Sequence, residues 1–232
     1  MKAKLSMLLC VLMLPILAFS QTSPYQFNWK KDLVYATGAG LIAVGGIFAD
    51  YQTRPLTQAQ VLSLDRFDQP GFDRLAINNW NPKADLASDV FLYSSIALPG
   101  LMMIHKDARK DFLVVGFMYA EVAMLTLGVT EFVKAGVKRP RPFVYNTSVE
   151  MGLKTERDAR FSFLSGHTSI TTALCFTTAK VFSDYSDNPT HEALVWTGAA
   201  VFPLITGYLR FEAGKHFPSD LIAGYLIGGT IG

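Results

Sequence analysis

The chain has 232 residues, enough for one large domain or two small ones, and half of them are apolar. Its 17 Phe and 3 Trp make a sizeable core available. The formal net charge of +2 is too small to indicate a nucleic-acid partner by itself, and we expect none.

The first twenty residues have the pattern of a secretory signal peptide. Two lysines, Lys2 and Lys4, precede an apolar run over 5–19 that is too short for a comfortable membrane span. Small residues lie just before Gln21, where a signal peptidase would cleave, and an uncleaved anchor is the alternative. We therefore expect a signal peptide over 1–20 and export to the cell envelope of a bacterium.

Six apolar segments follow, and none shows the alternation of a half-buried strand. They cover residues 33–49, 90–104, 112–127, 169–182, 193–209 and 221–232. We expect six helices and an all-α helix bundle. The stretches between them carry the polar residues, and we expect loops over 51–88, 134–166 and 210–218, with one or two short helices in the first.

The sequence leaves the location of these helices open. Most of the apolar runs are short for spanning a bilayer. The basic loop 105–111 would be cytoplasmic by the positive-inside rule, which places the loop 134–166 outside the cytoplasm. A cleaved signal peptide followed by three full spans would place the same loop inside, unless a segment such as 33–49 does not span. We favour a membrane-embedded bundle, with a soluble exported bundle as the alternative.

Three polar clusters stand at the junctions of these apolar helices. In chain order they are Lys134-x6-Arg141-Pro142, Ser165-Gly166-His167 and Arg210-x5-His216-x3-Asp220. Arg139 is also followed by a proline, but it lies at the wrong distance from Lys134 and is set aside.

In this order and spacing, the clusters resemble the type 2 phosphatidic acid phosphatase (PAP2) family, whose relatives include bacterial class A acid phosphatases and vanadium haloperoxidases. The resemblance covers roughly half of the chain. It implies a catalytic core over 107–232, after N-terminal helices and a loop over 21–106. Two positions depart from the family pattern: Leu164 replaces the usual proline and Leu209 the usual serine. Neither change removes a charged group or an imidazole.

The residues of the clusters also suit a phosphate group on their own chemistry. Arg141 and Arg210 each offer a planar fork of donors, and Lys134 adds a point charge. Ser165 is expected to cap the helix that follows, so that the next backbone amides face an anion at a helix N-terminus. Gly166 lets the backbone approach that anion closely.

The resemblance implies a division of labour between the two histidines. His216 would be the nucleophile and form a phosphohistidine, and Asp220, about one turn away, would accept a hydrogen bond from its other ring nitrogen. His167 would protonate the leaving alkoxide as the general acid and later activate water.

We expect neither a metal nor another cofactor. No apolar segment carries paired histidines at ligand spacing, and the resemblance implies that Arg and Lys act in place of a metal cation. Once the signal peptide and Cys10 are removed, Cys175 would be the only cysteine, so that no intrachain disulfide can form.

The leading interpretation is a metal-independent phosphatase with a periplasm-facing site, acting on a lipid phosphate or pyrophosphate. Candidate substrates are phosphatidic acid, phosphatidylglycerophosphate, undecaprenyl pyrophosphate and lipid A phosphate. The alternatives are a soluble exported acid phosphatase acting on small phosphomonoesters, a vanadate-dependent haloperoxidase, and a non-catalytic phosphate- or lipid-binding envelope protein. The sequence does not indicate an oligomeric state.

Overall fold

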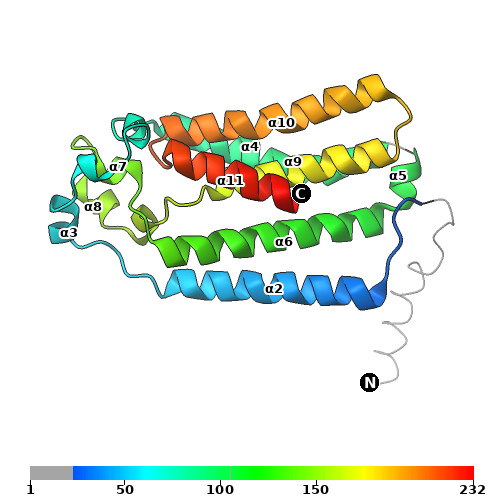
Figure 1. Cartoon of the computed structure of the whole chain (residues 1–232), viewed down its shortest axis with the longest axis horizontal. Helices are drawn as coiled ribbons and strands as arrows, with labels where there is room; N and C mark the ends of the chain where they lie inside the picture. The colour runs from blue at the N-terminus through cyan, green and yellow to red at the C-terminus, as the bar shows by residue number, and fades with distance from the viewer. Residues whose placement is uncertain (1–22, 105) are drawn as a thin grey trace, which may run out of the picture.

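A computed structural model describes residues 23–104 and 106–232, and over these ranges the chain is an all-α bundle (Figure 1). Its long helices are α2 (Trp29–Tyr51), α4 (Pro82–Leu101), α6 (Phe112–Val137), α9 (Gly166–Asp184), α10 (Pro189–Glu212) and α11 (Pro218–Ile231). The six expected helices and the all-α class are confirmed. The expected signal peptide and Cys10 lie outside the described residues.

Short helices fold most of the expected loops at one end of the bundle, on the left in Figure 1. They are α3 (Gln58–Leu62), η2 (Arg66–Asp68), η3 (Asp73–Ala76), α7 (Pro142–Tyr145), α8 (Met151–Lys154) and η5 (Arg157–Arg160). At the opposite end, η4 (Met102–Ile104) and α5 (Lys106–Lys110) join α4 to α6. The expectation of a loop over 134–166 is wrong at its start, because α6 continues to Val137.

Helix α4 begins well before residue 90, where the apolar pattern places its start. Its N-cap is Asn81, whose side chain accepts hydrogen bonds from the amides of Lys83 and Ala84 at 3.1 and 3.2 Å. Pro82 occupies the first helical position, where its missing N–H costs nothing. The first two turns are polar, so the apolar pattern misses them, and they project side chains into the end of the bundle.

Helix α9 is the centre of the bundle, because α4, α6, α10 and α11 all pack against it and most of its side chains are buried. Helix α2 packs on the side of α6 away from α10 (Figure 1). Glycines set the close approach of α2 and α6, since a Cβ on Gly128 would lie 2.5 Å from the backbone nitrogen of Ala43.

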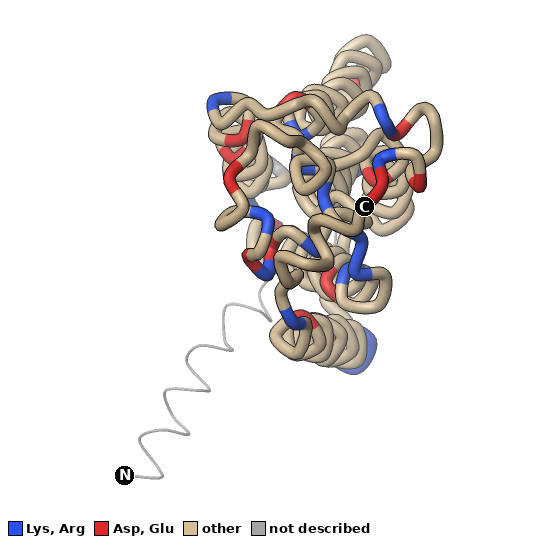
Figure 2. The backbone as a smooth tube through the Cα atoms, turned by 90° about the vertical axis from the view of Figure 1, so that its left-hand side faces the viewer, with Lys and Arg blue, Asp and Glu red and all other residues tan. Residues whose placement is uncertain are grey.

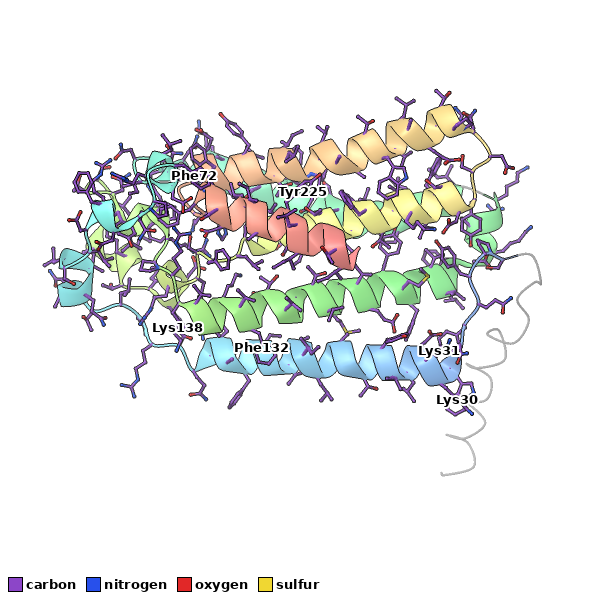
Figure 3. All side chains as sticks on the ribbon, in the orientation of Figure 1. Lys30, Lys31, Phe72, Phe132, Lys138 and Tyr225 are labelled. Atoms are coloured by element: carbon purple, nitrogen blue, oxygen red, sulfur yellow. The ribbon has the colours of Figure 1, made fainter. Side chains whose placement is uncertain are left out.

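Three segments are long and apolar enough to cross a membrane: Trp29–Tyr51, Phe112–Tyr145 and Pro189–Glu212. Large apolar side chains are exposed along the first and the third, including Leu33, Val34, Leu41, Val44, Phe48, Leu204 and Tyr208. Exposed apolar surface of this extent is typical of a face that contacts lipid or another protein. Figure 3 shows Lys30 and Lys31 at one end of α2, and Lys138 at the opposite end of the bundle. These features support the membrane-embedded bundle over the soluble alternative.

Candidate active site

The three clusters meet at the end of the bundle where α4, α9 and α11 begin and where α6 and α10 end. Figure 2 looks onto this end, where both basic and acidic residues are found. Four of the predicted site residues, Ser165, Arg141, Arg210 and His216, are no more than 4% exposed. The loops 134–166 and 210–218, which carry these residues, lie at the same end of the bundle.

His216 lies in the link between α10 and α11. Its Nδ1 is 2.6 Å from the carbonyl oxygen of Ser162, so Nδ1 carries the proton and donates it to that oxygen. Nε2 is 3.3 Å from Nη1 of Arg141. Burial lowers the pKa of His216 well below its ordinary value, and the cations Arg141, Arg210 and Lys134 lower it further. The imidazole is therefore neutral at neutral pH, with a lone pair on Nε2.

The predicted hydrogen bond between His216 and Asp220 is wrong. His216 Nδ1 and Asp220 Oδ2 are 3.9 Å apart, which is too far for a hydrogen bond. Asp220 instead accepts two hydrogen bonds on Oδ2. One comes from the hydroxyl of Ser162, and the other comes from the amide of Phe217 at 2.9 Å. The carboxylate thus holds the residue whose carbonyl fixes the tautomer of His216.

The Ser-Gly-His cluster opens α9 as the sequence predicts. Ser165 is the N-cap, with its hydroxyl 3.4 Å from the amide of Thr168. A Cβ on Gly166 would lie 3.2 Å from Nζ of Lys134. The glycine therefore allows the ammonium group to approach the start of α9, where Lys134 also pairs with Glu131 at 3.0 Å.

Arg141 joins the loop before α9 to His216. Its Nε and Nη2 donate to the carbonyl and the carboxylate of Asp158 at 2.9 and 2.7 Å, and Nη1 donates to the carbonyl of Lys215 at 3.1 Å. Burial alone would raise the pKa of Asp158, but Arg141 and Lys215 lower it to about 2. The carboxylate is therefore ionised at neutral pH and fixes the guanidinium beside His216.

Arg210, near the end of α10, is held by α4. Its Nη1 donates to a carboxylate oxygen of Asp85 and to the hydroxyl of Ser88, the latter at 3.1 Å. Its Nε is buried, and no other group in the described part of the chain accepts from it. A buried donor without an acceptor is costly, so this group is suited to an anion bound in the site.

Each of the three cations of the site, and also the imidazole of His167, has a carboxylate partner that sequence reasoning missed. The pairs are Lys134–Glu131, Arg141–Asp158, Arg210–Asp85 and His167–Asp89. A signal for the α4 residues was present, because Asp85, Ser88 and Asp89 recur at the spacing of one helical face directly before an apolar run. Asp158 stands in an irregular charged loop, where no pattern distinguishes it from its neighbours.

Arg139 does not reach His216, as its spacing predicts, but it organises the loops of this end. Its guanidinium donates to Asp220, Ser219, Gln69 and Asp73 at 2.6, 2.8, 2.6 and 2.8 Å. It also lies 4.0 Å from the ring centroid of Phe217. We call Arg139 and these four partners the loop clamp, because they tie η3 to the start of α11.

No group of three or more His, Cys, Asp or Glu among the described residues is placed to hold a metal ion. The site therefore offers two imidazoles, three cations held by carboxylates, and the N-terminus of α9. Such a site is suited to binding a phosphate group and to transferring it.

The family assignment agrees with this geometry. The sequence model of the PAP2 superfamily matches residues 115–232, which contain all three clusters, and the chain belongs to this family. The predicted boundary between an N-terminal part and a catalytic core at residue 107 stays a prediction.

Three relatives show how far the similarity extends. The lipid A 4'-phosphatase of Porphyromonas gingivalis is 26% identical over 141 residues, which are 60% of this chain and 56% of that protein. The chain thus spans little more than half the length of this curated relative. A crystal structure of a transmembrane PAP2-type phosphatidylglycerolphosphate phosphatase from Bacillus subtilis is 18% identical, with a TM-score of 0.49 over 87% of this chain and 92% of that one. LpxE from Aquifex aeolicus is 24% identical, with a TM-score of 0.45 over 68% and 88% of the two chains.

Proposed function

We propose that the protein is a membrane-embedded phosphatase that removes phosphate from a phosphorylated lipid through a phosphohistidine on His216. One observation carries this proposal. The lone pair of a neutral, tautomer-fixed His216 points toward Arg141, while Arg210 supplies a buried Nε without an acceptor among the described residues.

The cations would bind the phosphate through its non-bridging oxygens. Arg141 and Arg210 would supply planar donors, Lys134 would add a charge, and the N-terminus of α9 would add backbone donors. Phosphoryl transfer spreads negative charge over three oxygens in the transition state, and fixed cations in a water-poor site stabilise that charge strongly.

The first step transfers the phosphoryl group to His216. The lone pair of Nε2 attacks phosphorus, and the bond between phosphorus and the lipid oxygen breaks, leaving its electron pair on that oxygen. His167 gives the oxygen a proton, so that an alcohol departs. In the second step water attacks the phosphohistidine, its proton passes to His167, and the electron pair of the P–N bond returns to Nε2.

A lipid substrate follows from where the site lies. It stands at the end of helices that are long and apolar enough to span a membrane, which is the depth of a lipid headgroup. The relative from Porphyromonas gingivalis is named as a lipid A 4'-phosphatase, which supports a lipid phosphate in the cell envelope as the substrate class. Phosphatidic acid, phosphatidylglycerophosphate, undecaprenyl pyrophosphate and lipid A phosphate are the candidates, met at the periplasmic face.

A panel of lipid phosphates tests the proposal with the chain purified in detergent. We expect phosphate release from at least one lipid, resistance to EDTA, inhibition by vanadate, and loss of release in His216→Ala. Loss of activity on chelation, with recovery on adding a divalent metal, would contradict the metal-free mechanism. Turnover of water-soluble phosphate esters alone, by protein that stays monodisperse without detergent, would favour a soluble acid phosphatase instead.

A further inference from the structure

Asp89 reaches the site from α4, outside the matched family region 115–232. One of its carboxylate oxygens, Oδ1, lies 2.7 Å from Nε2 of His167. Asp85, one helical turn earlier on the same face, holds Arg210. Helix α4 packs against both α9 and α10, so its first turns place two carboxylates against two groups of the site.

The contact with Asp89 decides which nitrogen of His167 can act on a substrate. Nε2 is engaged by the carboxylate and must carry a proton to donate to it. Nδ1 is then the nitrogen that can give a proton to a leaving group. A charged partner on one ring nitrogen also fixes the orientation of the ring, as in other acid–base pairs.

The charges around His167 oppose its protonation. Arg210 faces it from α10, Arg141 from the link after α6, and Asp89 from α4. Burial, Arg210 and Arg141 lower the pKa of His167 and Asp89 raises it, and together they leave it at about 4. Among these charged groups, Asp89 is the one that favours the imidazolium, which is the form that can serve as an acid.

We propose that Asp89 is a positioning residue that orients His167 through Nε2 and stabilises its imidazolium, so that Nδ1 delivers the proton to the leaving oxygen. This inference rests on the proposed phosphatase function. The imidazolium gives its Nδ1 proton to the lipid oxygen as the P–O bond breaks, and Nε2–H stays bonded to the carboxylate. Nδ1 later takes a proton from water as the P–N bond breaks, which restores the imidazolium.

The test is a comparison of Asp89→Asn with the wild type on two substrates. Asn keeps an oxygen that can accept from Nε2, but it loses the charge. An alkyl phosphate needs a proton on its leaving oxygen, whereas p-nitrophenolate leaves nearly unaided. In single-turnover release of the alcohol at pH 7, we expect a loss of roughly ten- to hundredfold with the alkyl phosphate, the value of one charge-assisted hydrogen bond. With p-nitrophenyl phosphate we expect less than about threefold.

The pH profile separates this role from a purely structural one. Alcohol release from the alkyl phosphate should fall as pH rises through the pKa of His167 in the complex, and Asp89→Asn should move that fall to lower pH. Asp89→Glu, which restores the charge, should recover most of the rate. Asp68→Asn, an exposed carboxylate at the same end of the bundle, is the matched control and should change nothing.

Two outcomes would overturn the inference. Equal losses on both substrates, or an unmoved pH profile in folded Asp89→Asn, would mean that Asp89 only shapes the site. A wild type that releases no phosphate from any substrate would instead overturn the proposed function. Circular dichroism and size-exclusion chromatography in detergent establish that each variant is folded.

Discussion

Two arginines that stand two residues apart in the sequence, Arg139 and Arg141, are both built into the site end of the bundle, but they have different partners. Arg139 gives its terminal donors to the side chains of the loop clamp, including the buried carboxylates of Asp73 and Asp220. Arg141 is anchored on Asp158 and keeps Nη1 beside Nε2 of His216. We therefore expect Arg139 to serve the fold and Arg141 to serve the proposed chemistry.

The two arginines differ in whether their donors remain available to a ligand. The acceptors of Arg139 are Gln69 and residues of η3 and α11, so a ligand would have to displace the buried carboxylates of Asp73 and Asp220 to reach it. The set formed by Arg141, Arg210 and Lys134, which we call the anion-facing set, is instead grouped around His216 and the start of α9. Substitutions in the loop clamp should thus act on stability, and substitutions in the anion-facing set on turnover.

The largest expected effect is on the loop clamp. Arg139→Ala leaves Asp73 and Asp220 as buried carboxylates without their shared cation, and breaking a buried ion pair in this way costs about 3–5 kcal/mol of stability. Thermal unfolding in detergent measures it, with the exposed Arg66→Ala as the matched control. A variant that unfolds like the wild type but loses turnover would place Arg139 in the anion-facing set.

Arg141→Ala should lower turnover more than it lowers stability. Loss of one preorganised donor to a developing anion costs roughly 10²–10³-fold in turnover, while the melting temperature changes less than in Arg139→Ala. Arg141→Lys should recover only part of the rate, because an ammonium group lacks the planar fork. Steady-state kinetics and thermal unfolding of the same preparations check both statements. Full activity in Arg141→Ala would contradict its assignment.

A smaller effect is expected at Gly166. An added Cβ would press on Nζ of Lys134, and this flexible side chain would have to move away from the start of α9. We expect Gly166→Ala to weaken phosphate binding, seen as about a tenfold rise in KM with a smaller change in kcat. Gly136→Ala is the matched control, because Gly136 lies near the end of α6 but has open space where a Cβ would stand. This variant should leave KM unchanged.

The smallest effect is a dependence of stability on pH. The pKa of His167 is lowered from 6.5 to about 4 in the fold, and that of His216 is lowered as well. The unfolded chain therefore binds more protons in this window, and stability should fall as pH decreases from about 6.5 toward 4. His167→Gln should reduce this fall by on the order of 1–2 kcal/mol, a few degrees in melting temperature. The exposed His191→Gln should not, and an equal slope in all three proteins would contradict the assignment.

The sequence predicts the bundle well, because apolar runs and helix caps are local patterns. Apolar runs mark the six helices, and the resemblance to the PAP2 pattern selects Lys134, Arg141, Arg210 and His216 over Arg139, a choice that stays a prediction. Ser165 is recognisable as an N-cap because it precedes a helix, whatever the tertiary structure.

The partners of these residues depend on long-range packing and could not be predicted in the same way. Asp220 was expected to contact His216 from their separation along the chain, but His216 lies before the first turn of α11 and turns toward Ser162 instead. Asp85 and Asp89 stand in the polar start of α4, which an apolar pattern does not mark as helix. Asp158 is recognisable only when the loop is folded against Arg141.

The measurement that tests the central claim most directly is the chemical trapping of the phosphoenzyme. The purified protein is mixed with a lipid substrate labelled in its phosphate and quenched within one turnover. We predict a label on His216 in the wild type, a label that persists longer in His167→Gln because water is then poorly activated, and none in His216→Ala. Labelling of His216→Ala at the wild-type level would contradict the account.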